Sequence, residues 1–552
     1  MEGISSFVNL VVLDCGKNPF TVLDLNSLTK LEQLRINDST QLEYLFVKNG
    51  SFEYSGSYNN IPNISYVCVD PSDQNLWEYL RDLYGYNIVI NTFCTFEPGG
   101  EVYYLQGRAS LDVGADNCNS DGLGFPFLQL KLEDTEGNLA IFNTNSNGDY
   151  NIPLPEGSYD VTYQSPYLSY FDISPTSFSV NFPTDTSPYI QDICLTPNGN
   201  YDDLQVTMIP IDEARPGFDA NYRIIYANVG TKSLSGDVLL NFDDDVLDFV
   251  SASTTPDTQN TGTLSWSFTE LAPLEHKMID LVMNLNTPTE TPPLNGDEIL
   301  CYEVSISPTT DDHVPEDNDF SLKQTVVNSY DPNDKTCLEG NVITPDLVGE
   351  YVHYLIRFEN TGTASAINVV IRDVIDTSQF DMSSFVPIDA SHDFVTRIQN
   401  DNEVEFIFEG IELPFDDANN DGYVLFKIKT LPTLELGDTF ENSAEIYFDF
   451  NFPIITNVEQ TLIDNTASTD DFSVNSNISV FPNPANEYLT IKSQLSFDSV
   501  IIHDLTGKEI RRIVSTNSKL EQQVDVANLK GGIYYLTIVS GKSRTTQKFL
   551  KL

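Results

Sequence analysis

The chain has 552 residues, which is too long for a single hydrophobic core and predicts about three to five domains. Its 82 acidic and 28 basic side chains give a formal charge of −54, which argues against binding to nucleic acid or to an anionic membrane face. The composition, with 40% hydrophobic and 11% aromatic residues, is typical of folded β-rich domains and not of a disordered chain.

The first 95 residues repeat an apolar pattern. Leu10, Leu13, Cys15 and Asn18 have the spacing LxxLxCxxN, and Leu31 restarts the pattern 21 residues after Leu10. This segment resembles a leucine-rich repeat solenoid, in which apolar residues stack on those of the next repeat and the Asn satisfies backbone groups at the turn. We expect Cys15 to lie inside this solenoid.

A helix is expected at the end of the repeats, after a last strand at 64–69. Ser72 has the position of its N-cap, and the helix should bury an apolar stripe against the open end of the solenoid. The stripe consists of Leu76, Trp77, Leu80 and Leu83. At the other end the chain opens in mid-repeat without a cap and lacks the basic region and cleavage site of a signal peptide. We therefore expect that sequence upstream of residue 1 is missing.

From residue 96 onward, short alternating strands separated by Gly, Pro, Asn and Asp replace the helical periodicity. Residues 107–163 resemble the B-type repeats of bacterial surface proteins, which have a prealbumin-like fold and often a calcium-binding acidic turn. The resemblance implies that the turn DVGADNCNSDG binds calcium, and a plain polar turn is the alternative. Its candidate ligands are Asp112, Asp116, Asn119 and Asp121.

Two longer β-rich segments follow, and they are similar to each other. Each has an alternating strand that runs into an Asn-x-Gly-Thr turn, at Asn228 in the first and Asn360 in the second. We attribute the Asn and Gly of these turns to backbone conformations with positive φ. The strand spacing predicts an immunoglobulin-like sandwich for each segment, and both resemble repeat domains that serve as spacers in bacterial surface proteins. The stretch SYDPNDK, residues 329–335, is expected to be a linker with hinge properties.

The second of these segments contains a candidate calcium loop. Asp417, Asn419 and Asp421 offer oxygen ligands at alternate positions before Gly422, as in the first half of an EF-hand loop. The position that should close the loop with a bidentate acid is Ile428, and the preceding Asp416 could take over this role. Calcium binding and an ordinary Asp/Asn-rich turn both stay open.

The C-terminal 78 residues differ in charge from the rest of the chain. Residues 475–552 hold 10 basic and 6 acidic side chains, a net charge of +4, whereas the remainder has −58. A polar linker, residues 463–474, precedes this module and is expected to be exposed to proteases. A change of sign within one chain marks a module with a separate task.

The motifs of this module resemble the type A C-terminal sorting domain of the type IX secretion system, in order, in spacing and in their position at the very C-terminus. They include Pro482, Asn483, Pro484, Gly507, Lys508, Gly532, Tyr534 and Lys548. The resemblance implies two partners: the outer-membrane translocon, and the signal peptidase that removes the domain and releases the protein or links it to surface lipopolysaccharide. It also implies a secreted or surface-attached protein of the Bacteroidetes, whose multidomain secreted proteins have a similar order of parts.

Seven cysteines form no CxxC pair and no Cys/His cluster, so a zinc site is not supported. Cys68 and Cys94 flank the expected helix, and Cys118 and Cys194 bracket the expected prealbumin-like domain. Either pair can close a loop as a disulfide. The pairing of Cys301 and Cys337 stays open.

The expected fold is thus mainly β. A leucine-rich repeat fragment with a capping helix (1–95) is followed by a string of β-sandwiches, prealbumin-like (96–197) and immunoglobulin-like (198–330 and 331–462), then by the linker and the sorting domain.

No HExxH, GxSxG or P-loop motif is present, and the five histidines are scattered, so we expect no enzyme. No apolar run reaches the length of a membrane span. The predicted function is secreted or cell-surface binding and adhesion toward an unknown protein or glycan. The alternatives are a structural surface spacer and the accessory part of an extracellular hydrolase whose catalytic domain lies upstream.

Overall fold

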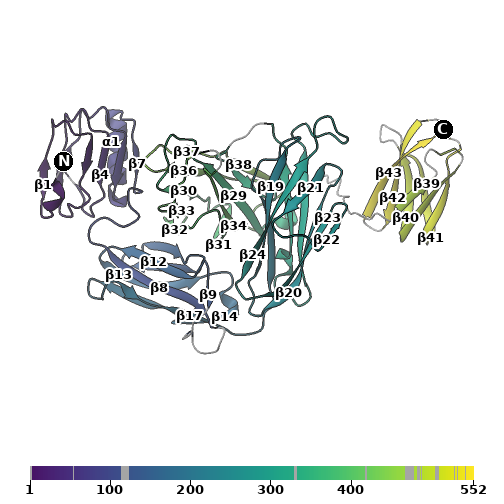
Figure 1. The fold of residues 1–552 in the computed structure, drawn as a ribbon, viewed down its shortest axis with the longest axis horizontal. Coiled ribbons are helices and arrows are strands. Elements are labelled where there is room, and N and C mark those ends of the chain that lie inside the picture. The colour runs from purple at the N-terminus through teal and green to yellow at the C-terminus, as the bar shows by residue number, and fades with distance from the viewer. Residues whose placement is uncertain are drawn as a thin grey trace. The chain divides into compact units, whose positions relative to one another are not determined.

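Strands form most of the fold, in agreement with the abundance of β-branched and aromatic residues (Figure 1). The computed structural model describes the whole chain except residues 1–2, 54, 113–117, 119–122, 329–331, 417–418, 466–477, 482–484, 487, 504–508, 528, 531, 541–542 and 552. The chain divides into two compact units, Met1–Asp464 and Asn465–Leu552.

The N-terminal part is a solenoid of two parallel sheets, in which successive strands of one sheet begin 21 to 23 residues apart. After a short 3-10 helix, η1 (Ile4–Ser6), one sheet contains β1 (Val12–Asp14), β3 (Gln33–Arg35) and β5 (Ser55–Ser57). The other contains β2 (Val22–Asp24), β4 (Tyr44–Val47), β6 (Tyr66–Val69) and β7 (Val89–Asn91). The core between the sheets consists of stacked leucines together with Cys15, which is 4% exposed. Asn18 Nδ2 donates to the carbonyl oxygens of Cys15 and Gly16, as expected for the turn.

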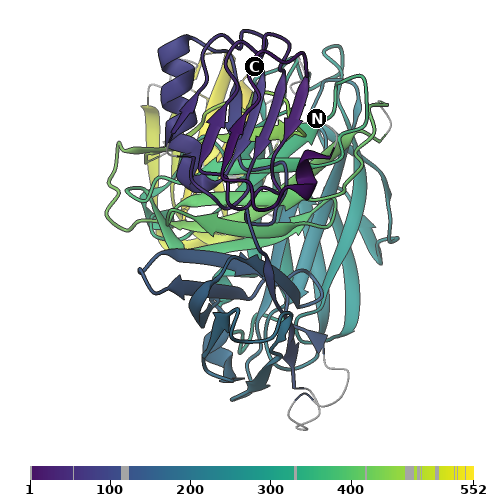
Figure 2. The ribbon, with the colours of Figure 1, turned by 90° about the vertical axis from the view of Figure 1, so that its left-hand side faces the viewer.

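The helix α1 (Gln74–Tyr84) follows η2 (Pro71–Asp73) and lies beside the parallel strands (Figure 2). It occupies the stretch of sequence in which a fourth strand of the β1–β3–β5 sheet would be due. Trp77 packs against Tyr58, just after β5, with ring centroids 5.1 Å apart. The helix therefore closes this sheet of the solenoid.

Three details of the expected cap are wrong. Ser72 is not the N-cap, because it lies inside η2; Asp73 has that position and makes no side-chain capping bond. Leu83 is 55% exposed, so the buried stripe ends at Leu80. The strand at 66–69 is not the last one, since the chain returns after α1 and adds β7 to β6.

Residues 103–197 form the next sandwich, which lies within the expected 96–197 and extends beyond the stretch 107–163 that resembles B-type repeats. Its strands are β8 (Tyr103–Leu111), β9 (Leu123–Gly124), β10 (Gln129–Asp134), β11 (Leu139–Asn143), β12 (Asp149–Leu154), β13 (Gly157–Gln164), β14 (Phe171–Ser174), β15 (Phe178–Phe182), β16 (Tyr189–Ile190) and β17 (Ile193–Pro197), with η3 (Leu168–Tyr170) before β14. One sheet has the order β12-β8-β17-β14, with β9 and β16 also paired to β8, and the other begins β15-β13-β10-β11.

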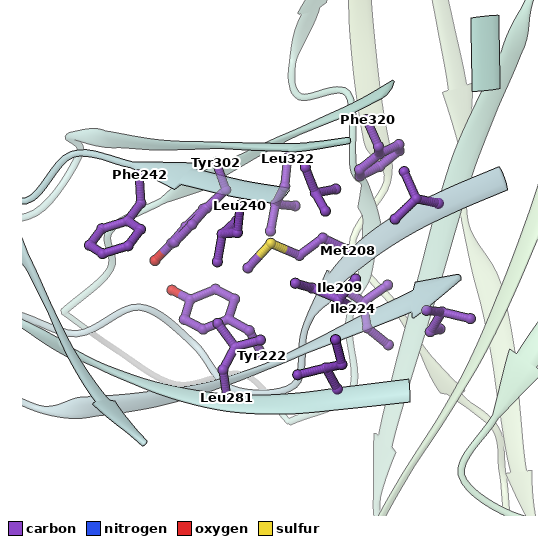
Figure 3. Packing of buried hydrophobic residues seen from close by; sticks show 14 of the residues in the cluster. Met208, Ile209, Tyr222, Ile224, Leu240, Phe242, Leu281, Tyr302, Phe320 and Leu322 are labelled. Carbon is purple, nitrogen blue, oxygen red and sulfur yellow. The ribbon is translucent and has the colours of Figure 1, made fainter. Parts of the chain in front are cut away.

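The following sandwich has two antiparallel sheets, β18-β19-β24-β21 and β22-β23-β20-β25-β26. Tyr222 and Tyr302 meet across the two sheets, with ring centroids 4.8 Å apart, in a core of aliphatic side chains (Figure 3). The elements are β18 (Leu204–Pro210), β19 (Asp219–Asn228), β20 (Leu234–Phe242), β21 (Leu247–Ala252), β22 (Thr258–Asn260), β23 (Thr263–Leu271), β24 (His276–Leu285), β25 (Ile299–Ser307), η4 (Pro315–Asp317) and β26 (Asp319–Thr325).

The third sandwich covers residues 335–463 and is built around a core rich in phenylalanine. Its sheets are β27-β29-β34-β31, β32-β33-β30-β36-β37 and the small β28-β38-β35. The elements are β27 (Lys335–Cys337), β28 (Val342–Ile343), η5 (Pro345–Leu347), β29 (Tyr351–Glu359), β30 (Val369–Val374), β31 (Phe380–Ala390), β32 (Val395–Gln399), β33 (Glu403–Phe408), β34 (Asp421–Thr430), β35 (Thr439–Asn442), β36 (Ala444–Phe448), β37 (Ile454–Ile455) and β38 (Glu459–Ile463).

The three sandwiches of residues 103–463 are not independent domains, because they share strand pairing and core contacts. β11 pairs with β32 through Ile141–Ile398 and Phe142–Arg397, so the sheets of two sandwiches merge into one sheet of nine strands. The core of the second sandwich also includes Leu355 and Leu425 of the third. Extra pairing and shared apolar contacts bury surface that isolated spacer domains would expose.

The C-terminal unit is a separate antiparallel fold. Its strands are β39 (Ile478–Phe481), β40 (Tyr488–His503), β41 (Glu509–Asp525), β42 (Gly532–Ser540) and β43 (Ser543–Lys551). The sheet order is β39-β40-β42-β43, and β41 pairs with β40. Leu489, Ile502, Leu536 and Phe549 are among the residues of its own small core.

Candidate functional site

The two sheets of the solenoid differ in what covers their outer faces. On the β4–β6–β7 side, Tyr66, Cys68, Val89 and Phe93 form an apolar cluster with residues of the 335–463 sandwich. Phe93 and Tyr447 make an edge-to-face contact at 5.0 Å between ring centroids. This face is therefore closed by an internal interface.

The outer face of β1, β3 and β5 lies open, and we call it the open solenoid face. It consists of Val12, Asp14, Gln33, Arg35, Ser55 and Ser57. The side chains of Asp14 and Arg35 are 63% and 45% exposed, and their charged atoms are 3.9 Å apart. Such an exposed pair contributes little to stability, so both charges are available for recognition.

A cluster of acids lies at one end of the second sandwich. Asp203 stands directly before β18, and Asp312 and Asp317 lie on the connection between β25 and β26. A backbone bridge between Asp202 and Asp312 brings the two segments together. As a result one ligand oxygen of each of the three acids lies within 4.8 Å of the others. We call this group the acid cluster.

Several oxygens at the acid cluster have no hydrogen-bond partner in the described part of the chain. They are Oδ1 of Asp203, Asp317 and Asn318, and all three are buried. The second atom of two of these groups is bonded: Tyr170 Oη donates to Asp203 Oδ2 at 2.5 Å, and Asn318 Nδ2 donates to Asp312 Oδ2 at 3.2 Å. Buried oxygens that lack donors carry a desolvation cost unless a cation meets them.

Burial also changes the protonation of these acids. It raises the pKa of Asp203 to about 6, an effect that the hydrogen bond from Tyr170 reduces and the charge of Asp312 increases. Burial raises the pKa of Asp317 to about 7, and the nearby ammonium of Lys427 opposes this rise. Oxygen ligands, several of them carboxylates, are what Ca²⁺ prefers, so the residues of the acid cluster fit this ion.

The calcium ligands predicted from sequence are elsewhere. Asn419 Nδ2 donates to Asp416 Oδ2 at 3.0 Å, Asp421 begins β34, and Ile428 is buried in the core. Asp417 lies outside the described residues. In the other predicted turn, Asp112 accepts a bond from Thr196 Oγ1 at 3.3 Å, whereas Asp116, Asn119 and Asp121 lie outside the described residues. No described residue of either turn belongs to the acid cluster.

Both cysteine pairs considered from the sequence form disulfides, Cys68–Cys94 and Cys118–Cys194. The first ties β6 to the segment after β7, and the second ties the loop after β8 to β17. Cys15 and Cys337 are free and buried, and Cys301 is free and exposed.

The end of the SYDPNDK stretch is not a hinge. Lys335 starts β27, its side chain is fully buried, and it forms an ion pair with the equally buried Asp373 of β30. Asn457 holds the Lys335 backbone on both sides, through Oδ1 to its N–H (2.8 Å) and through Nδ2 to its carbonyl (2.9 Å). Residues 329–331 lie outside the described residues. A polar, proline-containing string predicts a loop, but here its last residue belongs to the core.

Of the sorting motif, three residues can be followed in the fold. Gly532 opens β42, Lys548 lies in β43 opposite Tyr535, and the ring of Tyr534 stacks on Phe549 at 5.7 Å. Pro482, Asn483, Pro484, Gly507 and Lys508 lie outside the described residues. Among the residues that are described, no helix has the length and apolar character needed to span a membrane.

Two family models match parts of the chain. Residues 331–462 match a domain of unknown function, DUF7619, and residues 479–551 match the secretion system C-terminal sorting domain. The C-terminal module is therefore a sorting domain of the type IX secretion system of the Bacteroidetes, and it directs the protein to the cell surface or outside the cell. It implies interaction with the type IX secretion machinery.

No curated protein matches the sequence. Solved structures with partial likeness include the C-terminal domain of the antigen I/II-family protein AspA of Streptococcus pyogenes, at 10% identity and a TM-score of 0.18, covering 48% of this chain and all of that one. The major pilin subunit of Bacillus cereus is 8% identical, with a TM-score of 0.18, and the match covers 78% of this chain and 96% of the pilin. TM-scores this low support no inference about function.

Proposed function

We propose that the protein is a non-catalytic binding or adhesion protein, exported by the type IX system, whose solenoid is of the leucine-rich repeat type. The open solenoid face is the proposed recognition surface for a protein or glycan ligand. The observation that carries this proposal is the contrast between the two solenoid sheets: the 335–463 sandwich covers one outer face and leaves the other exposed. Inward leucines at a spacing of 21 to 23 residues support the repeat type.

A binding screen with a matched pair of charge reversals tests this proposal. The labelled full chain is applied to printed glycan arrays and to immobilised extracellular-matrix proteins. Arg35→Glu changes the open solenoid face, and Arg81→Glu makes the same change on α1 at similar exposure, 39% against 45%. We expect the wild-type chain and the Arg81→Glu variant to bind a ligand, and the Arg35→Glu variant to lose this binding. Equal binding by both variants would place recognition elsewhere, and the absence of binding would favour the structural spacer.

We also propose that the acid cluster binds Ca²⁺. Support comes from three acids whose ligand oxygens lie within 4.8 Å of one another and from the donorless, fully buried oxygen of Asn318 beside them. An ion that binds only the folded state, supplied at a hundredfold excess over its Kd, stabilises by about 2.7 kcal/mol.

Thermal unfolding in the presence of calcium and in the presence of a chelator tests whether the acid cluster binds Ca²⁺. We expect a higher Tm in calcium for the wild type and for Glu316→Gln, an exposed acid between the proposed ligands. Asp317→Asn should lose the calcium response. An unchanged wild-type Tm after chelation would refute this site.

We propose in addition that the sorting domain is removed after export within residues 463–476, by the signal peptidase of the system, and that the remaining protein is released or linked to lipopolysaccharide. The C-terminal residue of the mature protein, determined by mass spectrometry on the medium and on outer membranes of a secreting strain, tests both points. A mature protein that keeps residues 479–551 would contradict this processing.

A further inference from the structure

Three buried side chains from three strands meet at one point in the 335–463 sandwich. Lys335 of β27 forms its ion pair through Nζ and Asp373 Oδ2. Asn442, at the end of β35, donates from Nδ2 to the same Asp373 Oδ2 at 3.4 Å. The amine of Lys335 and the carboxamide of Asn442 thus both contact a single oxygen atom of Asp373, which makes them close neighbours.

The surroundings of this triad are apolar. The Nζ atom lies 4.9 Å from the ring centroid of Tyr354 and 5.4 Å from that of Phe426. Lys335 and Asp373 are both 0% exposed, and Asn442 is 5% exposed. Among the described residues, Nζ contacts these two rings besides Asp373, and the charge of Glu459 acts on it more weakly than that of Asp373.

Burial favours the uncharged forms of both partners. It lowers the pKa of Lys335, although the charge of Asp373 opposes this, and it raises the pKa of Asp373, although Lys335 opposes that. A neutral amine is a nucleophile, and a protonated carboxyl is a general acid. Asp373 Oδ1 is buried and has no hydrogen-bond partner in the described chain, so it is free to carry the proton.

We propose that Lys335 and Asn442 form an intramolecular amide cross-link, with Asp373 as the proton-transferring catalytic residue. The lone pair of neutral Nζ attacks Cγ of Asn442 while the Asp373 carboxyl protonates the amide oxygen. Asp373 then takes a proton from Nζ and delivers one to Nδ2. The Cγ–Nδ2 bond breaks and one ammonia molecule leaves, the proton on the former amide oxygen returns to Asp373, and a secondary amide joins the two side chains. No electrons are transferred to or from an outside reagent, and no co-reactant is required.

The positions of the two residues give such a bond a structural purpose. Lys335 stands at the start of the sandwich and Asn442 near its end, in two different sheets. A covalent bond between them would join β27, the first strand, to β35, near the end of the sandwich. Pulling the two chain ends apart would then no longer unfold this sandwich completely. The loop that it closes is long, which is where a cross-link restricts the unfolded chain most.

The intact mass of the full chain, measured after reduction of the disulfides, decides the proposal. We expect a mass lower than the sequence mass by one ammonia molecule, and a branched tryptic peptide that joins Lys335 to Asn442. A mass equal to the sequence mass would overturn the cross-link. Loss of one water molecule, together with a peptide that joins Lys335 to Asp373, would show that the lysine is linked to Asp373 and would overturn the proposed bond to Asn442.

Variants separate the roles of the three residues. Lys335→Arg and Asn442→Ala each remove one bonding partner, and Asp373→Asn leaves both partners but removes the acid. We expect full sequence mass in all three, whereas the control Lys323→Arg in the neighbouring sandwich should still lose ammonia. Ammonia loss that persists at residue 442 in Asp373→Asn would overturn the assignment of Asp373. Because the wild-type mass alone tests the bond, a variant that fails to fold does not leave the question open.

Discussion

Asn228 and Asn360 hold equivalent turns in two successive sandwiches with the same set of hydrogen bonds. In each turn Oδ1 accepts from the N–H two residues later, Gly230 or Gly362, at 3.1 Å. In each, Nδ2 donates to the carbonyl oxygen four residues later and to that of a leucine far along the chain, Leu271 or Leu413. Neither Asn has a positive φ, so the expectation from sequence was wrong about the cause: the side chain, and not the backbone, selects asparagine.

Asn360→Ala should destabilise the third sandwich by about 2–4 kcal/mol, because three hydrogen bonds are lost and buried carbonyls are left without a donor. Asn228→Ala should have a similar effect on the second sandwich. Urea unfolding followed by intrinsic fluorescence measures both, with the exposed Asn260→Ala as control. Equal stability of the Asn360 and Asn260 variants would refute the structural role of this turn.

Arg357 of the third sandwich pairs with one carboxylate of the second sandwich and with one in the segment that joins the two. Its Nε donates to Asp334 Oδ1 at 2.7 Å, and its Nη2 pairs with Glu213 of the preceding sandwich. Arg357→Met should cost about 3–5 kcal/mol, since it leaves two largely buried carboxylates without a cation. Differential scanning calorimetry should show a lower Tm for this variant and little change for Arg215→Met, whose side chain is exposed. A variant with the wild-type Tm would contradict the importance of this ion pair.

The two disulfides should contribute unequally to stability. The Cys118–Cys194 bond spans 76 residues and the Cys68–Cys94 bond 26, so their loss should cost about 4 and 3 kcal/mol. We expect reductant to lower the Tm. Replacing both cysteines of one pair by serine should lower the stability by the amount assigned to that disulfide. Cys301→Ser is the control, because that thiol is free. A Tm that does not respond to reductant would refute the pairing.

The acid cluster should make stability depend on pH when calcium is absent. Folding raises the pKa of Asp203 to about 6 and that of Asp317 to about 7, from ordinary values of 3.8. Groups with raised pKa values stabilise the folded state below the unfolded pKa, and this contribution is lost as the pH rises through the folded pKa. In chelator, the Tm should therefore fall as the pH rises from about 4 to about 8.

Calcium should reverse that trend, because the ion binds the deprotonated carboxylates and protons compete with it. Thermal unfolding measured across this pH range with and without calcium tests both effects. The Asp317→Asn variant should show a weaker dependence of the Tm on pH. A chelated protein whose Tm stays constant from pH 4 to pH 8 would contradict the raised pKa values.

Periodic features of the fold could be predicted from the sequence. The spacing of leucines gave the parallel solenoid, and alternation gave the strands of the sandwiches, because both follow from which side chains face the core. The sorting domain was identified from motifs and a change of charge, and its family model matches residues 479–551.

Contacts between distant segments could not be predicted. Asp203 meets Asp312 and Asp317 only because a backbone bridge aligns two segments at one end of a sandwich. Lys335 has the local sequence of a linker, and its burial depends on Asp373 and Asn442, which arrive on other strands. The local sequence around Lys335, a single lysine after a polar stretch, does not indicate that its side chain is buried. A charged residue at the first position of a predicted strand is the one signal that could have suggested a buried ion pair.

The pairing of β11 with β32 also sets an order of events during synthesis. The ribosome produces residues 139–143 long before residues 395–399, so the edge of the first sandwich stays uncovered over that interval. An exposed edge strand is a template for pairing with another chain, and closure over so long a sequence separation is slow. Nascent chains of this protein therefore pass through a period of vulnerability to aggregation that ends only when most of the third sandwich has been made.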